Sequence, residues 1–379
     1  ADDFHTFVQD IKRTTGCEKV GISATCLGTN IVMAYVAKYG AKDIQGIGMD
    51  GSVVGGAEIL SEVVCGKFDV APPALMRILR DVDGLGMFSI DEFIMETIDM
   101  LVRTGVLESV ISTTENIFYD KLIKGATSAL ALSTFYTWPN YWACVSPEDY
   151  ETAKDYVFGD EGSEKRVKYA GLIEKLDAYY NQISSRSDEI LLTAQEKGVH
   201  IGIIAKYGTH VMPFTERQNL VSDRLVSVSA TTFGATTSTT RGQLADEYIA
   251  ERTALGYGEY ISPDKKVDLS TALFKDTTWV LKNCSHDHWG HEELIIENFF
   301  RSTNLTTKND DTWPRFLVCQ SKEYDDYYEG MLLEMTEENP GEDLWEDTPT
   351  ETKDSTIWTK LAALFRWLTA VFKALLHVM

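Results

Sequence analysis

The sequence predicts an α/β protein built around a parallel sheet, and three observations lead to this class. The opening about 50 residues alternate between apolar stripes at helical spacing and short apolar runs typical of buried strands. Two further strand patterns return at 199–205 and 277–281, and a polar loop follows each. The chain has 379 residues, 44% of them hydrophobic, which is enough for one large domain or two.

A helix is expected to open the chain, over 4–14. Gly16 ends it, and the apolar run 19–23 predicts a strand. A tight turn and a second helix through residue 38 come next, and the run 44–49 after Gly40 predicts the neighbouring strand. These elements form a βαβ unit of a parallel sheet. The apolar residues of the first helix recur at i, i+3, i+4 and i+7: Phe4, Phe7, Val8 and Ile11.

Changes in hydrophobic spacing and in composition divide the chain into five segments. Apolar residues recur at helical spacing after the first strands, and this stretch is expected to be a helical insertion. Near the end, Glu, Asp, Pro and Thr predominate in a stretch that cannot bury enough apolar surface to order itself. The segments are 1–71 (first part of the α/β core), 72–197 (helical insertion), 198–335 (rest of the core), 336–355 (acidic linker) and 356–379 (terminal helix).

The terminal helix, 357–379, is apolar with basic residues toward one side. Three basic residues interrupt it, so contact with a membrane surface is favoured over crossing the membrane. Packing on its own domain or on a partner subunit explains the pattern equally well.

Charge and cysteine usage exclude some classes of function. A formal charge of −23 disfavours nucleic acid as a partner, because phosphate binding needs clustered Lys and Arg. Six cysteines without a CxxC pair indicate neither a disulfide scaffold nor a structural zinc site. The first residues show no signal peptide, and the sequence does not determine the cellular location. A secreted or membrane-peripheral location is compatible with it.

The motif with the most specific chemistry lies between the first strand and the second helix. A nucleophile elbow needs small residues two before and two after the nucleophile, because the strand-to-helix turn is tight. Ala24 and Gly28 meet this need around Cys26. Ser23 would lie inside the strand and is rejected. The elbow predicts Cys26 as a nucleophile and the N–H of Leu27 as an oxyanion donor; a buried, inert cysteine is the alternative.

Residues 7–12 and 16–20, together with this elbow, resemble bacterial lipases and acyltransferases related to lecithin:cholesterol acyltransferase. The resemblance implies an α/β-hydrolase fold with a large helical cap. In that family the strand after the cap ends in Tyr-Gly, as Tyr207-Gly208 does here, and a later Asp-Gly-Thr-Val segment supplies the catalytic acid. The similar segment here contains Asp223, with Arg224 and Leu225 in place of the glycine and threonine. The family's histidine follows the last strand, which implies His286 as the base.

Other residues compete for these roles. His288 is the alternative base, and Asp264, Asp268 and Asp276 are alternative acids, of which Asp264 is favoured because it lies in a turn-like Ser-Pro-Asp sequence. His286, Asp287, His288 and His291 can also be interpreted as a metal cluster. No His-Glu-x-x-His spacing supports that interpretation, and we expect no metal and no cofactor.

An aromatic run at 135–142 lies near the end of the predicted cap. In the family, apolar cap residues line an acyl pocket, which implies Trp138, Tyr141 and Trp142 as substrate-binding residues. Ordinary core packing of a helical subdomain is the alternative.

The resemblance also implies several strands and a His-Gly type oxyanion loop before the elbow, and the sequence has no counterpart to them. We therefore expect an N-terminally truncated sheet whose edge is covered by missing strands, a partner chain or a second copy. The expected function is hydrolysis or transfer of a lipid or other acyl ester by a Cys-His-Asp triad through an acyl-enzyme. Alternatives are polyhydroxyalkanoate-synthase-like acyl transfer and a degenerate hydrolase homologue that acts as a binding or structural protein.

Overall fold

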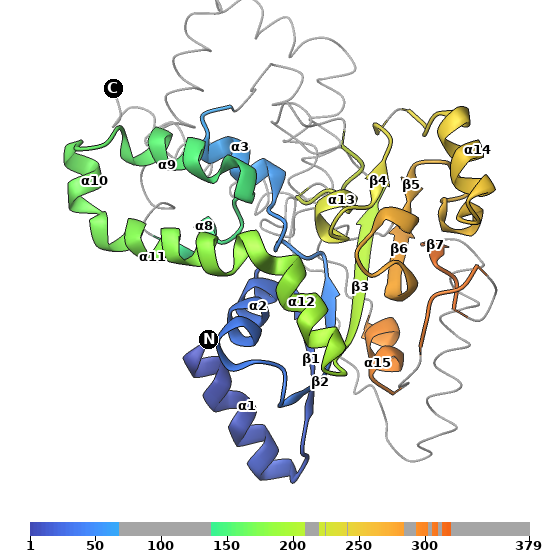
Figure 1. Ribbon diagram of the computed structural model, residues 1–379, viewed down its shortest axis with the longest axis horizontal. Helices are drawn as coiled ribbons and strands as arrows, with labels where there is room; N and C mark the ends of the chain where they lie inside the picture. Colours follow the sequence, from blue (N-terminus) through green and yellow to red (C-terminus); the bar gives the residue numbers. More distant parts are fainter. Residues whose placement is uncertain are drawn as a thin grey trace, which may run out of the picture.

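A five-stranded parallel sheet forms the centre of the protein, as the computed structural model shows (Figure 1). The structure describes residues 1–67, 138–208, 220–223, 225–240, 242–283, 293–301, 305–309 and 313–319. The strand order is β1-β2-β3-β6-β7, with every neighbouring pair parallel. The predicted α/β class is therefore confirmed. The strands are β1 (Val20–Thr25), β2 (Ile44–Asp50), β3 (His200–Tyr207), β6 (Thr278–Lys282) and β7 (Phe316–Val318).

Three helices cover one face of the sheet: α1 (Asp2–Thr15), α2 (Leu27–Tyr39) and α12 (Ser187–Glu196). Side chains alternate between the two faces of a strand, so Ile201 and Ile203 of β3 point to these helices. The helices expected over 4–14 and through residue 38 are confirmed, and each extends slightly beyond the apolar stripe that predicted it. The strands likewise continue past their apolar runs into polar residues that still pair with their neighbours.

Helix α15 (Glu293–Arg301) packs against the opposite face through Phe299 and Phe300. Glycines on three adjacent strands make room for these rings. A Cβ at Gly21 or Gly46 would lie 3.0 or 3.2 Å from the ring of Phe300, and one at Gly202 would lie 2.9 Å from that of Phe299. The protein is thus three layers deep, with helices on both faces of the sheet, as is usual for parallel sheets.

An ion pair lies inside the sheet near the carboxyl ends of its strands. The Lys206 ammonium on β3 lies 2.7 Å from the carboxylate of Asp50 on β2, and each side chain is only 1% exposed. A buried pair of this kind compensates two charges that would each be costly alone. The backbone carbonyl of Asp50 also accepts a hydrogen bond from the N–H of Cys26.

A helical part packs on α3 (Glu58–Val64), which follows β2. Its core contains Trp142, Tyr150 and Phe158. Helix α11 (Ala170–Gln182) lies within the stretch expected to be a helical insertion, of which residues 72–137 lie outside the described residues. The elements are α8 (Pro139–Trp142), η3 (Pro147–Asp149), α9 (Tyr150–Phe158), α10 (Glu164–Lys168), α11 (Ala170–Gln182) and η4 (Ser184–Arg186).

Between β3 and β6 the chain forms short elements around a two-stranded antiparallel ladder of β4 and β5. No described helix is long and apolar enough to cross a membrane. The expected linker 336–355 and terminal helix 356–379 lie outside the described residues. The elements are α13 (Val228–Thr231), β4 (Thr236–Thr237), α14 (Asp246–Ala254), η5 (Gly258–Tyr260), β5 (Val267–Asp268), η6 (Leu269–Thr271) and η7 (Lys275–Thr277).

Candidate functional site

Cys26 occupies the turn between β1 and α2 in a backbone conformation that few non-glycine residues adopt. Its φ is 51° and its ψ is −124°. Such a conformation costs on the order of 1–3 kcal/mol and persists only where the surroundings enforce it. Two backbone hydrogen bonds hold this conformation. The Cys26 N–H donates to the Asp50 carbonyl, and the Cys26 carbonyl accepts from the Thr29 N–H, both with an N···O distance of 3.0 Å. The predicted tight strand-to-helix turn is therefore present.

The small residues predicted around this turn face each other. A Cβ at Gly28 would lie 3.7 Å from the Cβ of Ala24, so the two positions are in van der Waals contact across the turn. Leu27 is the first residue of α2, and the first N–H groups of a helix have no acceptor within that helix. The backbone thus places the N–H of Leu27 next to the thiol-bearing residue.

Cys26 packs in a small apolar cluster that joins distant parts of the chain, and we call it the Cys26 cluster. Its side chain is half-buried. Leu225 and Val226, some 200 positions further along the sequence, belong to the cluster, so the Asp223 segment and the Cys26 turn share one apolar core. The cluster consists of Cys26, Leu27, Val53, Ala57, Leu60, Cys144, Leu225, Val226 and Ala230.

Asp223 is buried and held by its own turn. Its Oδ1 accepts hydrogen bonds from the N–H of Leu225 at 3.1 Å and of Val226 at 2.9 Å. Its backbone N–H donates to the carbonyl of Val226 at 3.2 Å. The residues that fix the carboxylate therefore belong to the same cluster as Cys26.

Glu58 is a buried acid beside this turn that the sequence analysis did not identify. Its Oε2 accepts the N–H of Ser227 at 3.0 Å. Burial raises the pKa of Glu58, and the nearby charge of Asp223 adds to the rise. A single glutamate at the start of a short helix matches no motif, so no signal in the sequence marks it.

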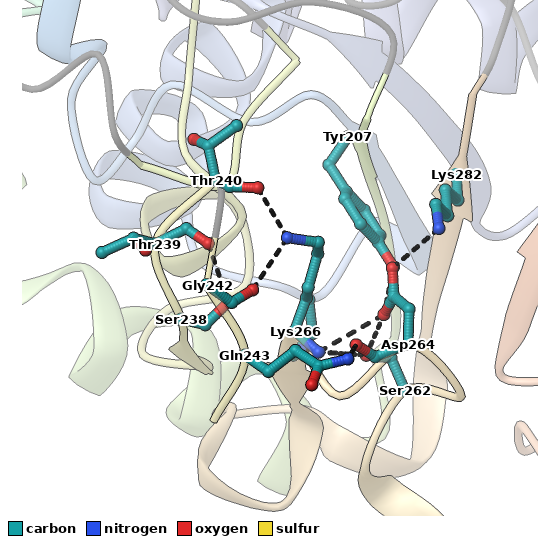
Figure 2. A network of polar contacts seen from close by, with 11 residues as sticks. Tyr207, Ser238, Thr239, Thr240, Gly242, Gln243, Ser262, Asp264, Lys266 and Lys282 are labelled. Carbon is teal, nitrogen blue, oxygen red and sulfur yellow. Dashed lines mark hydrogen bonds and ion pairs between the residues drawn. The ribbon is translucent and has the colours of Figure 1, made fainter. Parts of the chain in front are cut away.

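The competing acid Asp264 is engaged elsewhere, at the ends of β3 and β6 (Figure 2). Its carboxylate accepts the Tyr207 hydroxyl at 3.0 Å and the Ser262 hydroxyl at 2.7 Å, and the Lys282 ammonium lies 2.9 Å away. Burial raises the pKa of Asp264, but these three partners together hold it below its ordinary value. Asp264 therefore serves as an anchor between strands.

The other two competing acids are also held by cations. Asp268 accepts hydrogen bonds from Arg252 and Tyr248, and Asp276 pairs with Lys275. Of the four candidate acids, Asp223 is the one whose turn belongs to the Cys26 cluster.

The candidate bases lie outside the described residues. β6, the strand expected to precede them, ends at Lys282, and His286 and His288 follow in a segment that the structure does not describe. Asp287 and His291, the remaining members of the alternative metal cluster, lie there too. Within the described ranges no group of three His, Cys, Asp or Glu side chains could hold a metal ion. The role of His286 stays a prediction.

The three aromatic residues expected to bind substrate differ in their surroundings. Trp138 is 54% exposed. The Tyr141 hydroxyl donates to the carbonyl of Leu60, a member of the Cys26 cluster. Trp142 is 0% exposed and stacks on Phe158 with ring centroids 5.3 Å apart, so it packs in the core of the helical part. Substrate binding by these residues stays a prediction, and the packing of Trp142 matches the alternative of a core role.

The described geometry therefore brings the turns of Cys26 and Asp223 together, with the buried carboxyl of Glu58 next to them. Comparisons of the chain with protein-family models, with curated proteins and with solved structures find no match.

Proposed function

We propose that the protein is an esterase or acyltransferase of the α/β-hydrolase type in which Cys26 is the nucleophile. The observation that carries the proposal is the backbone of Cys26, with φ 51° and ψ −124° at a strand-to-helix turn. A sharp, strained turn of this kind exposes the nucleophile of such enzymes above the carboxyl end of the sheet. An ordinary structural cysteine does not need this costly conformation.

The order of the strands supports the same proposal. Cys26 follows β1, Asp223 comes after β3, and His286 comes after β6, and these strands lie in the order β1-β2-β3-β6 across the sheet. Loops after parallel strands gather at one edge, where ligands and catalytic groups lie in open α/β sheets. The chain order of nucleophile, acid and base is the one that α/β-hydrolases use.

The proposed reaction has two steps. The Cys26 thiol transfers its proton to His286, and Sγ attacks the acyl carbonyl; the C–O bond then breaks, and the alcohol leaves with the proton from His286. The product is a thioester on Cys26. Water or a second alcohol gives its proton to His286, attacks the thioester, and releases the acid or the new ester while the proton returns to Sγ. Asp223 orients His286, and the Leu27 N–H stabilises the oxyanion, a contribution worth about 10² to 10³ in rate.

Labelling and turnover of one ester test this proposal. Because Cys17 is an exposed free cysteine, the Cys17→Ser variant is the reference protein. With 4-nitrophenyl butyrate we expect steady release of nitrophenol and a transient butyryl thioester, which mass spectrometry of quenched protein locates on Cys26. Adding Cys26→Ala should abolish both signals.

The matched control is Cys144→Ala, since Cys144 is a second free cysteine in the same cluster. Burial raises the pKa of the Cys144 thiol to about 12, so it is a poor nucleophile, and its loss should leave the thioester on Cys26. If turnover and labelling survive Cys26→Ala, Cys26 is not the nucleophile and the proposal is wrong. If the reference protein shows neither signal, the alternative of a binding or structural protein gains support.

A further inference from the structure

A pocket of about 1020 Å³ opens beside the Cys26 cluster. Ala230 belongs to both, since it packs in the cluster and also lines the pocket. Ser227, which directly follows the cluster residue Val226, lines the pocket too. A molecule that fills this pocket therefore lies beside the cluster to which the proposed nucleophile belongs.

Backbone packing closes the inner wall of the pocket. A Cβ at Gly55 would lie 2.8 Å from the carbonyl oxygen of Ala230, so the segment before α3 lies directly against α13. Glu58 lines the same wall, where its carboxyl accepts the Ser227 N–H. This wall has little freedom to move.

The described segments 237–240 and 242–245 form another wall, and Lys266 binds both of them (Figure 2). The Lys266 ammonium donates hydrogen bonds to the carbonyls of Thr240 at 2.6 Å and Gly242 at 2.9 Å. The Ser238 hydroxyl lies 2.9 Å from the Thr239 carbonyl and 3.2 Å from that of Gly242. Because these hydrogen bonds hold the two described segments without a ligand, less conformational entropy is lost there when a ligand binds.

The polar lining of the pocket consists mostly of hydroxyl groups. Hydroxyls and amides both donate and accept hydrogen bonds, so they match a ligand with many hydroxyls of its own. The carboxyls disfavour an anion. Among the lining residues that the structure describes there is no Lys, Arg or aromatic side chain, so none of them favours a phosphate or a fatty acyl chain. The polar lining residues are Glu58, Ser146, Glu148, Ser227, Ser229, Thr237, Ser238, Thr239 and Gln243.

We propose that this pocket binds a neutral sugar, which is the alcohol part of the ester on which Cys26 acts. The link to the ester bond rests on the proposed function; the sugar pocket itself does not. Glu58 adds a specific donor, because burial raises its pKa and keeps the carboxyl protonated to a higher pH than in an ordinary glutamate. A protonated carboxyl can donate a hydrogen bond to a sugar hydroxyl and accept another.

Binding is tested first, without any turnover. Methyl glucoside, galactoside and mannoside are added to the full chain, and saturation-transfer NMR detects the bound sugar. Thr239→Trp places an indole in the pocket from an exposed position, and Thr253→Trp makes the same change on the exposed surface of α14. We expect a signal from at least one glycoside in the wild type and in Thr253→Trp, and its loss in Thr239→Trp. No signal in the wild type, or an unchanged signal in Thr239→Trp, overturns the sugar pocket.

Turnover then tests the link to Cys26 with two esters that share one acyl group. We expect Thr239→Trp to raise KM for 6-O-octanoylglucose by about tenfold or more and to leave ethyl octanoate within about twofold. Equal effects on both esters overturn the link. If the wild type cleaves neither ester but still binds sugar, the esterase proposal fails and the sugar pocket stands. 6-O-Acetylglucose, measured in parallel, distinguishes a soluble sugar ester from a glycolipid as the source of the sugar.

Discussion

Cys26 and Glu58 are both held in states that cost free energy. Cys26 has a positive φ, and the carboxyl of Glu58 is removed from water with the N–H of Ser227 as a partner. Such costs are carried by the surrounding fold, and they concentrate at functional sites. Cys26 shares a cluster with residues of the 225–230 segment, and Glu58 accepts a hydrogen bond from it, which is the reason to treat the two residues as parts of one site.

Glu58→Gln tests the buried state of this carboxyl. Because the folded-state pKa of Glu58 lies above its ordinary value of 4.5, the native protein binds the proton more tightly than the unfolded chain does. Stability is therefore full below pH 4.5 and falls as the pH rises through the raised pKa. Gln can still accept a hydrogen bond from the Ser227 N–H but does not ionise. The melting temperature of the variant minus that of the wild type should therefore increase as the pH rises from 4.5 to neutral.

Thermal unfolding across this pH range measures the effect, with Glu247→Gln on the exposed face of α14 as the control. A difference between Glu58→Gln and wild type that stays constant with pH would contradict the raised pKa.

Helix α15 packs on the sheet where three neighbouring strands each carry a glycine. Gly21, Gly46 and Gly202 lie on three neighbouring strands, and the rings of Phe299 and Phe300 occupy the space that their missing side chains leave. This packing holds α15 against the face of the sheet opposite α2. Glycine inside a strand often marks a place where another element approaches the strand closely, and here that element is α15.

Gly202→Ala should therefore weaken the contact between β3 and α15. The new Cβ would lie 2.9 Å from the ring of Phe299, so the ring or the helix must shift. We expect a loss of about 1–3 kcal/mol in the free energy of unfolding, measured by urea denaturation.

Gly171→Ala is the matched control, because Gly171 lies in α11 and a Cβ there would meet nothing within 4 Å. This change should be neutral or stabilise the protein by about 0.5–1 kcal/mol. Equal stability of Gly202→Ala and wild type would show that the ring moves aside without cost.

At the scale of the whole molecule, the Asp264 anchor joins the part between β3 and β6 to the sheet. Tyr207 and Lys282 stand at the ends of these two strands, and both contact the Asp264 carboxylate (Figure 2). The Ser262 hydroxyl and the Lys266 N–H donate to the same carboxylate, and the Lys266 ammonium in turn binds the segments that form a wall of the pocket. One acid thus fixes the position of the proposed sugar pocket relative to the sheet.

Asp264→Asn should lower the free energy of unfolding at neutral pH by about 1–3 kcal/mol, because Lys282 loses its charged partner. The folded-state pKa of Asp264 lies below 3.8, so its contribution is present above pH 3.8 and is lost as the pH falls through the folded value. Urea denaturation at several pH values should therefore show the wild type and the variant converging in acid.

Asp246→Asn provides the control, since Asp246 pairs with Lys265 at a site where its side chain is 84% exposed. Exposed pairs contribute about 0–1 kcal/mol. If both variants lose the same small amount at neutral pH, Asp264 is not an anchor.

Local patterns predicted much of the fold. The helices at α1 and α2 and the strands β1, β2, β3 and β6 were each predicted from apolar periodicity, which depends only on neighbouring residues. The short elements between β3 and β6 were not predicted, because β4 and β5 each have two residues and are stabilised by contacts that local sequence does not encode.

The sequence by itself determined the parallel sheet and the strand-turn-helix around Cys26, because spacing and small residues specify both locally. Only the tertiary structure decided that the turn of Asp223 shares an apolar cluster with Cys26, that Asp264 anchors two strands, and that Glu58 is a buried acid beside a pocket. These outcomes depend on contacts between residues far apart in the chain. Such contacts follow from how whole elements pack, and no pattern within one segment contains them.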